Sequence, residues 1–261
     1  MDLGLAGRRA IVTGASKGIG LAVTRRLVEE GALVVGGSRG TTPELAALVD
    51  GGRVTAVPVD LATATGPDDL VAAALADGPV DILINNAGAV TPRTGGFLTI
   101  TDDDWWASLQ LNLLSAVRTT RAVTSHMIDR QRGSIVNTAS VNATLPDPLV
   151  IDYGAAKAAL ANFSKALSKH LGPHGIRVNA VGPGPVSTGL WLGTGGVAAT
   201  VSGAAGLTPE DVARTAVRDS ATGRFTTAEE VADLIVFLAG DRAANITGVN
   251  YILDGGLTQT L

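Results

Sequence analysis

The chain has 261 residues, of which 46% are hydrophobic and 17% are charged, and its net charge is −4. This composition is typical of a folded globular protein, and the acidic balance without a long basic run argues against nucleic acid as a partner. The chain has no cysteine, which excludes disulfides and thiolate metal sites and favours a cytoplasmic protein.

Short hydrophobic runs rich in β-branched residues alternate with helical patterns along the chain. Most of these runs are continuously apolar, which is typical of parallel strands buried on both faces. Strands are expected at 9–14, 32–37, 53–59, 80–86, 133–139, 176–182 and 248–254. Helices are expected at 18–31, 42–50, 67–77, 101–130, 152–172 and 227–240, where apolar residues recur at helical spacing. No apolar stretch is long enough to span a bilayer, so we expect no membrane association.

This alternation predicts an α/β fold: a single doubly wound domain over residues 1–261, with a seven-stranded parallel sheet and helices on both faces. One stretch, 184–207, breaks the rhythm because it is rich in Gly, Ala, Thr and Ser and has no clear periodicity. Long loops in compact domains are usually functional lids or disordered segments. We therefore expect a substrate loop at about 184–222, in which Leu190, Trp191 and Leu192 form an apolar tip suited to closing over a ligand.

The sequence TGASKGIG, residues 13–20, lies between the first strand and the first helix. Its glycines at 14, 18 and 20 allow close approach of the backbone, and the helix N-terminus offers free N–H groups and positive dipole charge. This is where a Rossmann-type fold holds a pyrophosphate. The spacing differs from the common G-x-G-x-x-G, and a plain tight turn is the alternative.

Ser38 and Arg39 follow the second strand, where NAD-binding folds usually carry an acidic residue for the ribose 2′-hydroxyl. A guanidinium can bind a 2′-phosphate through two hydrogen bonds, and Lys17 in the glycine turn can add a second cation. The alternative is that Arg39 and Lys17 are two solvated surface cations. The pair favours NADP(H), with NAD(H) as the second choice.

Tyr153 and Lys157 lie four residues apart in the alanine-rich stretch DYGAAKAAL, so they share one helix face. Taken alone, such a pair is common by chance and fits a surface residue beside a solvated charge. Five further motifs accompany it: TGASKGIG, NNAG (85–88), Asn112, Ser140 and GPGPVST (182–188). Their order and rough spacing, over essentially the whole chain, resemble the single-domain branch of the short-chain dehydrogenase/reductase family.

The resemblance implies that Tyr153 is the general acid that protonates a carbonyl oxygen, or the base in the reverse direction. Lys157, together with the oxidised nicotinamide, is expected to lower the tyrosine pKa and to bind the nicotinamide ribose. Ser140 is expected to bind the substrate oxygen, with a turn or capping role as the alternative. Asn112 is expected to distort its helix and hold a water that links Lys157 to solvent, with a purely structural contact as the alternative.

The same resemblance assigns the cofactor contacts. Asn86 is expected to tie adjacent strands, and Asp60 to accept a hydrogen bond from the adenine amino group unless it is a simple turn aspartate. The predicted cofactor-binding residues are Gly14, Ser16, Lys17, Gly18, Ile19, Gly20, Ser38, Arg39, Asp60, Leu61, Asn86, Ala87, Gly88, Tyr153, Lys157, Pro183, Val186 and Thr188. The three histidines lack ligand spacing, so no metal site is expected.

The function implied is NADPH-dependent reduction of a carbonyl to an alcohol, with a 3-oxoacyl thioester as the first candidate substrate. An alcohol, sugar or steroid dehydrogenase is the alternative within the same chemistry, and a non-catalytic nucleotide-binding regulator is the alternative of a different class. The acidic balance does not help to recruit an acidic carrier protein, so carrier binding stays open. The resemblance also implies a homo-oligomer, a tetramer or a dimer.

Overall fold

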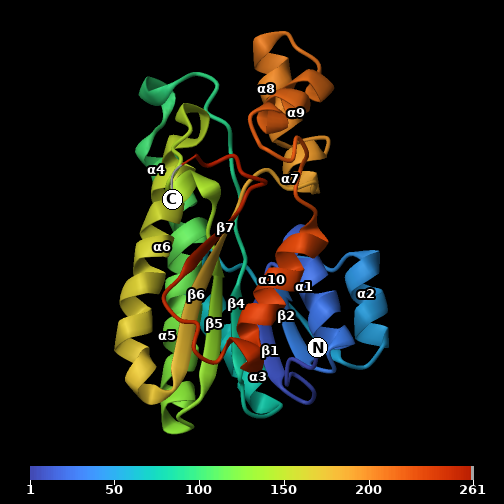
Figure 1. Ribbon diagram of the computed structural model, residues 1–261, viewed down its shortest axis with the longest axis vertical. Helices are drawn as coiled ribbons and strands as arrows, with labels where there is room; N and C mark the ends of the chain where they lie inside the picture. The colour runs from blue at the N-terminus through green and yellow to red at the C-terminus, as the bar shows by residue number, and fades with distance from the viewer. Residues whose placement is uncertain (260–261) are drawn as a thin grey trace.

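Seven parallel strands form one sheet in the order β3-β2-β1-β4-β5-β6-β7 in the computed structural model, which describes residues 1–259 (Figure 1). The order reverses between β1 and β4, and open α/β sheets bind ligands at the carboxyl ends of the strands beside such a point. The predicted fold class is confirmed. The strands are β1 (Arg9–Thr13), β2 (Leu33–Ser38), β3 (Val54–Pro58), β4 (Ile82–Asn85), β5 (Gly133–Thr138), β6 (Ile176–Pro183) and β7 (Asn250–Leu253).

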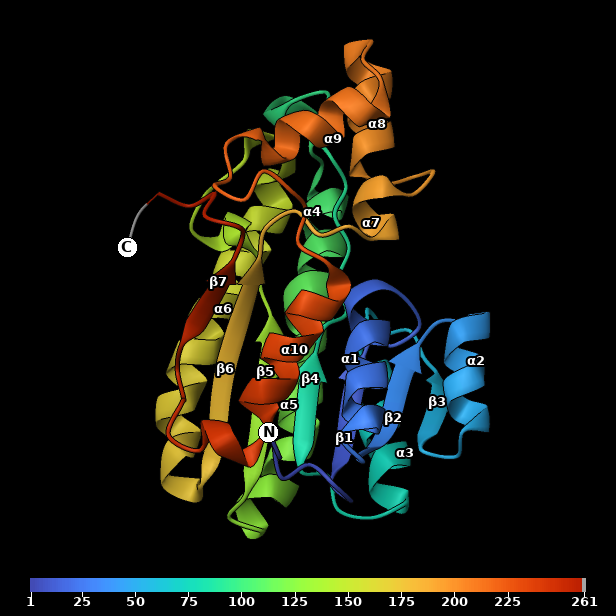
Figure 2. The same ribbon diagram turned by 45° about the vertical axis from the view of Figure 1, so that its right-hand side comes forward.

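Helices cover both faces of the sheet (Figure 2). α1 (Gly18–Glu29), α2 (Pro43–Asp50) and α10 (Ala228–Ala239) enclose one apolar core, in which Leu27, Ile84 and Ile235 are fully buried. α3 (Gly66–Ala76), α5 (Ser115–Asp129) and α6 (Ile151–Leu171) enclose the other. Because the strands lie between two apolar layers, their continuous hydrophobic runs are explained by burial on both faces.

The helix expected at 101–130 is interrupted. α4 (Asp102–Leu109) leads into a π-helical segment, Gln110–Leu114, and α5 follows directly. A single π turn inside an α-helix is uncommon and occurs often at functional sites. Short 3-10 turns complete the connections at Phe97–Thr99, Val141–Ala143, Pro148–Val150, Gly172–His174 and Asp241–Ala243.

The segment expected to be an irregular substrate loop contains three helices: α7 (Gly189–Leu192), α8 (Val197–Ala205) and α9 (Pro209–Arg218). Its many small residues gave no readable period, but α8 ends at Gly206 in a left-handed conformation and Thr208 caps α9. The three helices gather at the end of the molecule toward which the strands point (Figures 1 and 2). We call residues 187–225 the lid segment; it begins and ends beside a bridge between Val186 and Thr226.

In the described part of the chain, no single helix is long and apolar enough to cross a membrane. One bent pair, residues 189–205 with 209–218, passes on length and composition only when the two are taken together, across a bend of 106°.

Candidate active site

The four predicted catalytic residues come from three elements near the carboxyl ends of the central strands. Ser140 follows β5, Tyr153 and Lys157 lie on the first two turns of α6, and Asn112 lies in the π-helical segment. Lys157 is 3% exposed, Asn112 2% and Ser140 5%. The fold thus brings polar and ionisable groups together in a place with little access to water.

Tyr153 and Lys157 share one face of α6. The Lys157 Nζ lies 5.7 Å from the centre of the Tyr153 ring and donates a hydrogen bond to the Thr138 carbonyl oxygen at 2.7 Å. Burial lowers the pKa of Lys157 to about 8. Burial also raises the pKa of Tyr153, and the Ser140 hydroxyl offsets part of that rise. The protein groups alone therefore do not give the low tyrosine pKa that we expect with an oxidised nicotinamide present.

Ser140 caps a short turn as well as facing the tyrosine. Its Oγ accepts a hydrogen bond from the Asn142 N–H at 3.1 Å and donates to the Asn142 Oδ1 at 3.3 Å. The capping role considered from the sequence is therefore present. It does not exclude the other role, because the same hydroxyl acts on the pKa of Tyr153.

Asn112 explains the π-helical segment. Its side-chain amide donates to the Ala89 carbonyl oxygen at 2.9 Å, and its Oδ1 accepts from the Ala89 N–H at 3.1 Å. This pair of bonds ties the helix to the segment after β4. It is the helix distortion that the resemblance implies, and it places Asn112 beside the lysine, because a Cβ added at Gly88 would contact both Asn112 and Lys157.

The glycine turn after β1 has the shape and charge of an anion site. Gly14 and Gly18 have positive φ values of 70° and 55°, and a Cβ at Gly20 would overlap the Gly14 carbonyl oxygen. Lys17 is the N-cap of α1 but makes no side-chain cap, and the first turn has no acidic residue. The N–H groups and dipole of this helix end are left to attract an anion such as a pyrophosphate.

The NNAG motif is anchored to the glycine turn. Asn86 Nδ2 donates to the Thr13 carbonyl oxygen at 3.0 Å, and the N–H groups of Asn86 and Ala87 both donate to Thr13 Oγ1. Asn86 thus ties β4 to β1. Thr13 has a role that sequence reasoning missed, although its place as the last residue of a strand before a glycine turn was a usable signal.

The residues predicted for the adenosine end are only partly free to bind. Arg39 and Lys17 are exposed, whereas Ser38 is nearly buried and donates to the Gly40 carbonyl oxygen. Asp60 is exposed, but its Oδ1 accepts from the Ala62 N–H at 3.0 Å, which is the turn role considered as the alternative. The Leu61 side chain is buried in the core, so only its backbone remains for a cofactor.

The GPGPVST turn approaches the glycine turn from the other side. The Thr188 methyl group would lie 3.5 Å from a Cβ at Gly18, and Pro183 ends β6. Trp191 in the lid segment packs edge-to-face on Phe225, with ring centres 5.5 Å apart. The apolar tip expected around Trp191 therefore consists of Leu190 and Leu192, which are 44% and 51% exposed.

The model of the short chain dehydrogenase family matches residues 8–194, which include the glycine turn, NNAG and the predicted catalytic residues. The chain belongs to this family. A 3-oxoacyl-[acyl-carrier-protein] reductase of Chlamydia pneumoniae is 32% identical over 99% of this chain and all of its own length. A putative ketoacyl reductase of monensin polyketide synthase from Streptomyces virginiae is 38% identical, with 96% and 97% of the two chains covered.

A solved structure gives a similar result for the fold. L-Sorbose reductase from Gluconobacter frateurii, complexed with NADPH and L-sorbose, superposes with a TM-score of 0.91 at 34% identity, and the match covers both chains fully. The protein is thus a short-chain dehydrogenase/reductase, an oxidoreductase of the class that acts with a nicotinamide dinucleotide.

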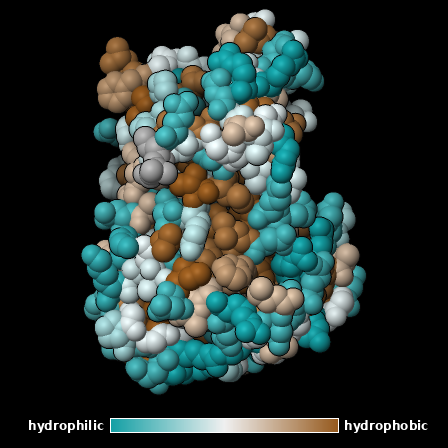
Figure 3. Space-filling view, viewed as in Figure 1, coloured by the Kyte–Doolittle hydropathy of each residue, from teal (hydrophilic) through white to brown (hydrophobic). Residues whose placement is uncertain are grey.

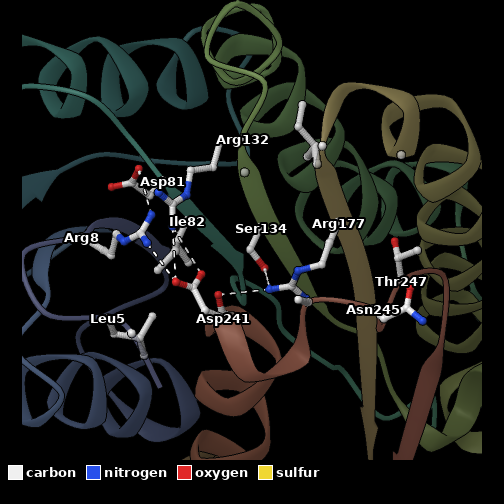
Figure 4. Close-up of a pocket in the computed structure, with 17 residues that line it drawn as sticks. Leu5, Arg8, Asp81, Ile82, Arg132, Ser134, Arg177, Asp241, Asn245 and Thr247 are labelled. Carbon is white, nitrogen blue, oxygen red and sulfur yellow. Dashed lines mark hydrogen bonds and ion pairs between the residues drawn. The ribbon is translucent and has the colours of Figure 1, made fainter. Parts of the chain in front are cut away.

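A cavity of about 380 Å³ lies at the amino ends of the central strands, at the opposite end of the sheet from the predicted catalytic residues. Its arginines are already engaged (Figure 4): Arg8 pairs with Asp241, and Arg177 donates to Ser134 and to the carbonyl oxygens at the end of α10. Cationic groups near a helix C-terminus stabilise its free carbonyls. We therefore assign Arg177 to binding the free carbonyl oxygens at the C-terminus of α10. The candidate active site of this short-chain dehydrogenase is the polar group of residues at the carboxyl ends of the strands.

Sequence reasoning also missed a charged cluster next to the catalytic helix. Arg93 lies between β4 and α4, and its guanidinium contacts Asp152 and Asp104. No periodic pattern marks an arginine in a loop. The only signal was an aspartate directly before Tyr153 in a stretch otherwise made of small and apolar residues.

Proposed function

We propose that the protein is an NADPH-dependent reductase that converts a carbonyl group to an alcohol. The observation that carries this proposal is the grouping of the half-buried Tyr153 with the buried Ser140 and Lys157 at the carboxyl ends of the strands, with Asn112 tied to the same region. A protein that only binds a nucleotide needs the glycine turn but not a half-buried phenol beside a buried serine and a buried lysine. This grouping supports turnover over the regulator alternative.

In this proposal the nicotinamide, when bound, supplies the hydride. The Tyr153 hydroxyl gives its proton to the substrate oxygen, and Ser140 donates a hydrogen bond that orients that oxygen. Lys157 keeps positive charge near the phenol and binds the cofactor ribose. The turn at Gly14, Gly18 and Gly20 holds the pyrophosphate against the start of α1.

The cofactor is proposed to be NADPH because two exposed cations, Lys17 and Arg39, stand where the adenosine ribose is expected. Arg39 follows a strand end that carries serine, so no carboxylate there would repel a 2′-phosphate. The similarity to an NADPH-complexed reductase supports this choice. NAD(H) remains the alternative cofactor.

We propose an uncharged carbonyl compound with an apolar portion as the substrate, and a 3-oxoacyl thioester as the first candidate. Residues 184–207 contain no charged side chain, and Leu190 and Leu192 expose large apolar surfaces on the lid segment. An apolar pocket cannot pair the many hydroxyls of a sugar, and unpaired buried hydroxyls are costly. The L-sorbose reductase similarity keeps a sugar as the second candidate.

The proposed chemistry is tested by adding NADPH to the protein with acetoacetyl thioesters, simple ketones and L-sorbose. We expect loss of NADPH absorbance with at least one thioester or ketone. Tyr153→Phe should lower kcat by roughly 10²–10⁴-fold because it removes the proton donor, while the Kd for NADPH stays unchanged. Tyr251→Phe, which changes the other tyrosine of the chain, should keep wild-type turnover.

Tight NADPH binding without turnover of any carbonyl would instead favour the regulator. Full turnover by Tyr153→Phe would place the acid elsewhere.

We also propose a homo-oligomer that buries the face formed by α10 and β7. Apolar side chains gather in the middle of the face seen in Figure 3, over the region where Figure 1 places β7 and α10. β7 is an edge strand of the sheet, and Val249 beside it is 38% exposed. Exposed apolar patches beside a sheet edge are typical of contact surfaces. Sedimentation velocity would contradict this proposal by finding a monomer at micromolar concentration.

A further inference from the structure

We propose that Arg93 is a positioning residue for Tyr153. Its guanidinium joins three segments and fixes the start of α6, on which the phenol stands. This inference rests on the proposed role of Tyr153 as the general acid.

The contacts of Arg93 are short and directional. Nε and Nη2 donate to the two carboxylate oxygens of Asp152 at 3.2 and 2.6 Å, and Nη1 donates to Asp104 Oδ1 at 2.8 Å. The planar guanidinium fork matches a carboxylate in this two-bond arrangement, which fixes orientation as well as distance. The backbone N–H of Arg93 also donates to the Leu149 carbonyl oxygen at 2.7 Å.

The start of α6 needs this support because it lacks a cap of its own. The N-cap residue, Val150, has no side-chain acceptor and an irregular backbone with φ −140° and ψ 45°. Uncapped first turns fray easily. Asp152 stands in that first turn directly before Tyr153, and it is held by a residue 59 positions away in the sequence. The Arg93–Asp152 pair anchors this uncapped turn to a distant segment of the chain.

The chain segment that carries Arg93 also carries proposed cofactor contacts. The segment 86–101, on which it lies, begins with the last three residues of NNAG and includes Ala89, the residue that holds Asn112. Asp104 stands in the first turn of α4 and closes a capping box with Thr101. Arg93 therefore fixes the catalytic helix relative to the segment that carries the proposed cofactor contacts.

The pair is also buried enough for its charge to matter. The Asp152 side chain is 3% exposed and that of Arg93 13%, whereas Asp104 is 34% exposed. Without the guanidinium, a buried carboxylate would stand unpaired one residue from the phenol. An unpaired buried charge is strongly unfavourable, and it shifts the pKa values of neighbouring groups.

The expected kinetic effect separates position from binding. Arg93→Gln should lower kcat roughly 10²-fold, because about 1 Å of misplacement of a reacting group costs that much. The Kd for NADPH should stay within about twofold, since the glycine turn is untouched. Arg93→Lys keeps the charge but not the fork, so we expect an intermediate kcat. Asp152→Asn combined with Arg93→Gln should lose no more activity than Arg93→Gln alone, because the two side chains act as a unit.

A titration of Tyr153 gives a readout that does not need turnover. The chain has two tyrosines, so in a Tyr251→Phe background the tyrosinate absorbance with NADP present reports Tyr153 alone. Arg93→Gln should raise the pKa of Tyr153, because the Asp152 carboxylate is left unpaired, Asp152→Asn should lower it, and the double variant should return it near wild type. All variants leave the other charges on the packed elements unchanged. These are Lys157, Lys165, Lys169 and His170 on α6, Asp102, Asp103 and Asp104 on α4, Asp147 before Pro148–Val150, and Arg177 on β6.

Arg26 supplies a matched control, because its guanidinium also joins two carboxylates, those of Glu29 and Asp233, far from the catalytic helix. Arg26→Gln should leave kcat and the tyrosine titration unchanged. If Arg93→Gln behaves like Arg26→Gln while Tyr153→Phe abolishes turnover, the positioning role is wrong and the proposed function stands. If wild-type protein reduces no carbonyl but the opposite shifts of the tyrosine pKa are seen, the proposed function fails and the positioning role survives.

Discussion

Burial shifts the two ionisable residues of the site toward their uncharged forms. It lowers the pKa of Lys157 to about 8 and raises that of Tyr153. A phenolate beside Lys157 thus needs additional positive charge nearby, of the kind that the ring of an oxidised nicotinamide carries. The tyrosine is expected to release its proton readily only when a cofactor of that charge is present, which couples acid–base chemistry to the redox state.

Arg39 decides the cofactor if the proposal is right. Arg39→Asp replaces a cation by a carboxylate at the place expected for the 2′-phosphate, so the Kd for NADPH should rise by roughly 10–100-fold, as for the loss of a charge-assisted hydrogen bond. The Kd for NADH should change little. Fluorescence titrations with both cofactors measure this, and Arg53→Asp, at another exposed arginine, is the control. An unchanged NADPH to NADH preference would contradict the role of Arg39.

At the scale of elements, the glycine turn packs so tightly against the start of α1 that no room is left for a side chain at Gly20. Gly20→Ala places a methyl group against the Gly14 carbonyl oxygen and the Asn86 side chain, so the turn and the NNAG segment must separate. We expect the Kd for NADPH to rise more than about 10-fold and the free energy of unfolding to fall by about 1–3 kcal/mol, as for an overpacked site. Calorimetric titration and urea unfolding test both.

Gly40→Ala is the matched control, because a Cβ there meets nothing within 4 Å and should leave both quantities near wild type. Wild-type affinity in Gly20→Ala would show that the turn does not hold the cofactor.

The strands were predictable because burial on both faces leaves continuous apolar runs. Local patterns did not reveal the π-helical segment, since it depends on a bond between Asn112 and Ala89, 23 residues apart; only the family resemblance implied a distorted helix at Asn112. α7 and α8 escaped detection because residues such as Ala, Gly and Thr give little contrast between the faces of a helix. α9 was missed although Thr208, Pro209 and its amphipathic pattern are signals of a helix. Local patterns thus predicted elements wherever burial dictated the sequence, and failed where a distant contact or small residues decided the structure.

For the molecule as a whole, the buried lysine predicts a pH dependence of stability. The folded pKa of Lys157 is about 8 against an ordinary 10.5, so between these values the unfolded chain binds more protons and stability rises with pH. Relative to Lys157→Met, the free energy of unfolding of wild type should increase by about 3 kcal/mol from pH 7 to pH 10.5. Urea unfolding of both proteins across this range measures the difference, and a constant difference would contradict the buried ammonium.

The proposed catalytic residues were chosen from the sequence because their types and spacing resemble a family pattern. Their environment was not predictable, since the Arg93–Asp152 pair and the Lys157–Thr138 bond join positions brought together only by the complete sheet. The direction of the tyrosine pKa in the protein alone also depends on burial, which spacing does not encode. Motifs thus supplied the candidate reacting groups, and the fold was needed to show what holds them.

The lid segment leaves and rejoins the body at one place, the bridge between Val186 and Thr226. An insert with adjacent ends can be exchanged without altering the strands beneath it, just as loops with close ends tolerate replacement. Under the proposed function, grafting residues 187–225 from a relative with another substrate should change substrate selectivity while Tyr153 and the glycine turn keep their places. In this architecture, recognition and chemistry can diversify independently.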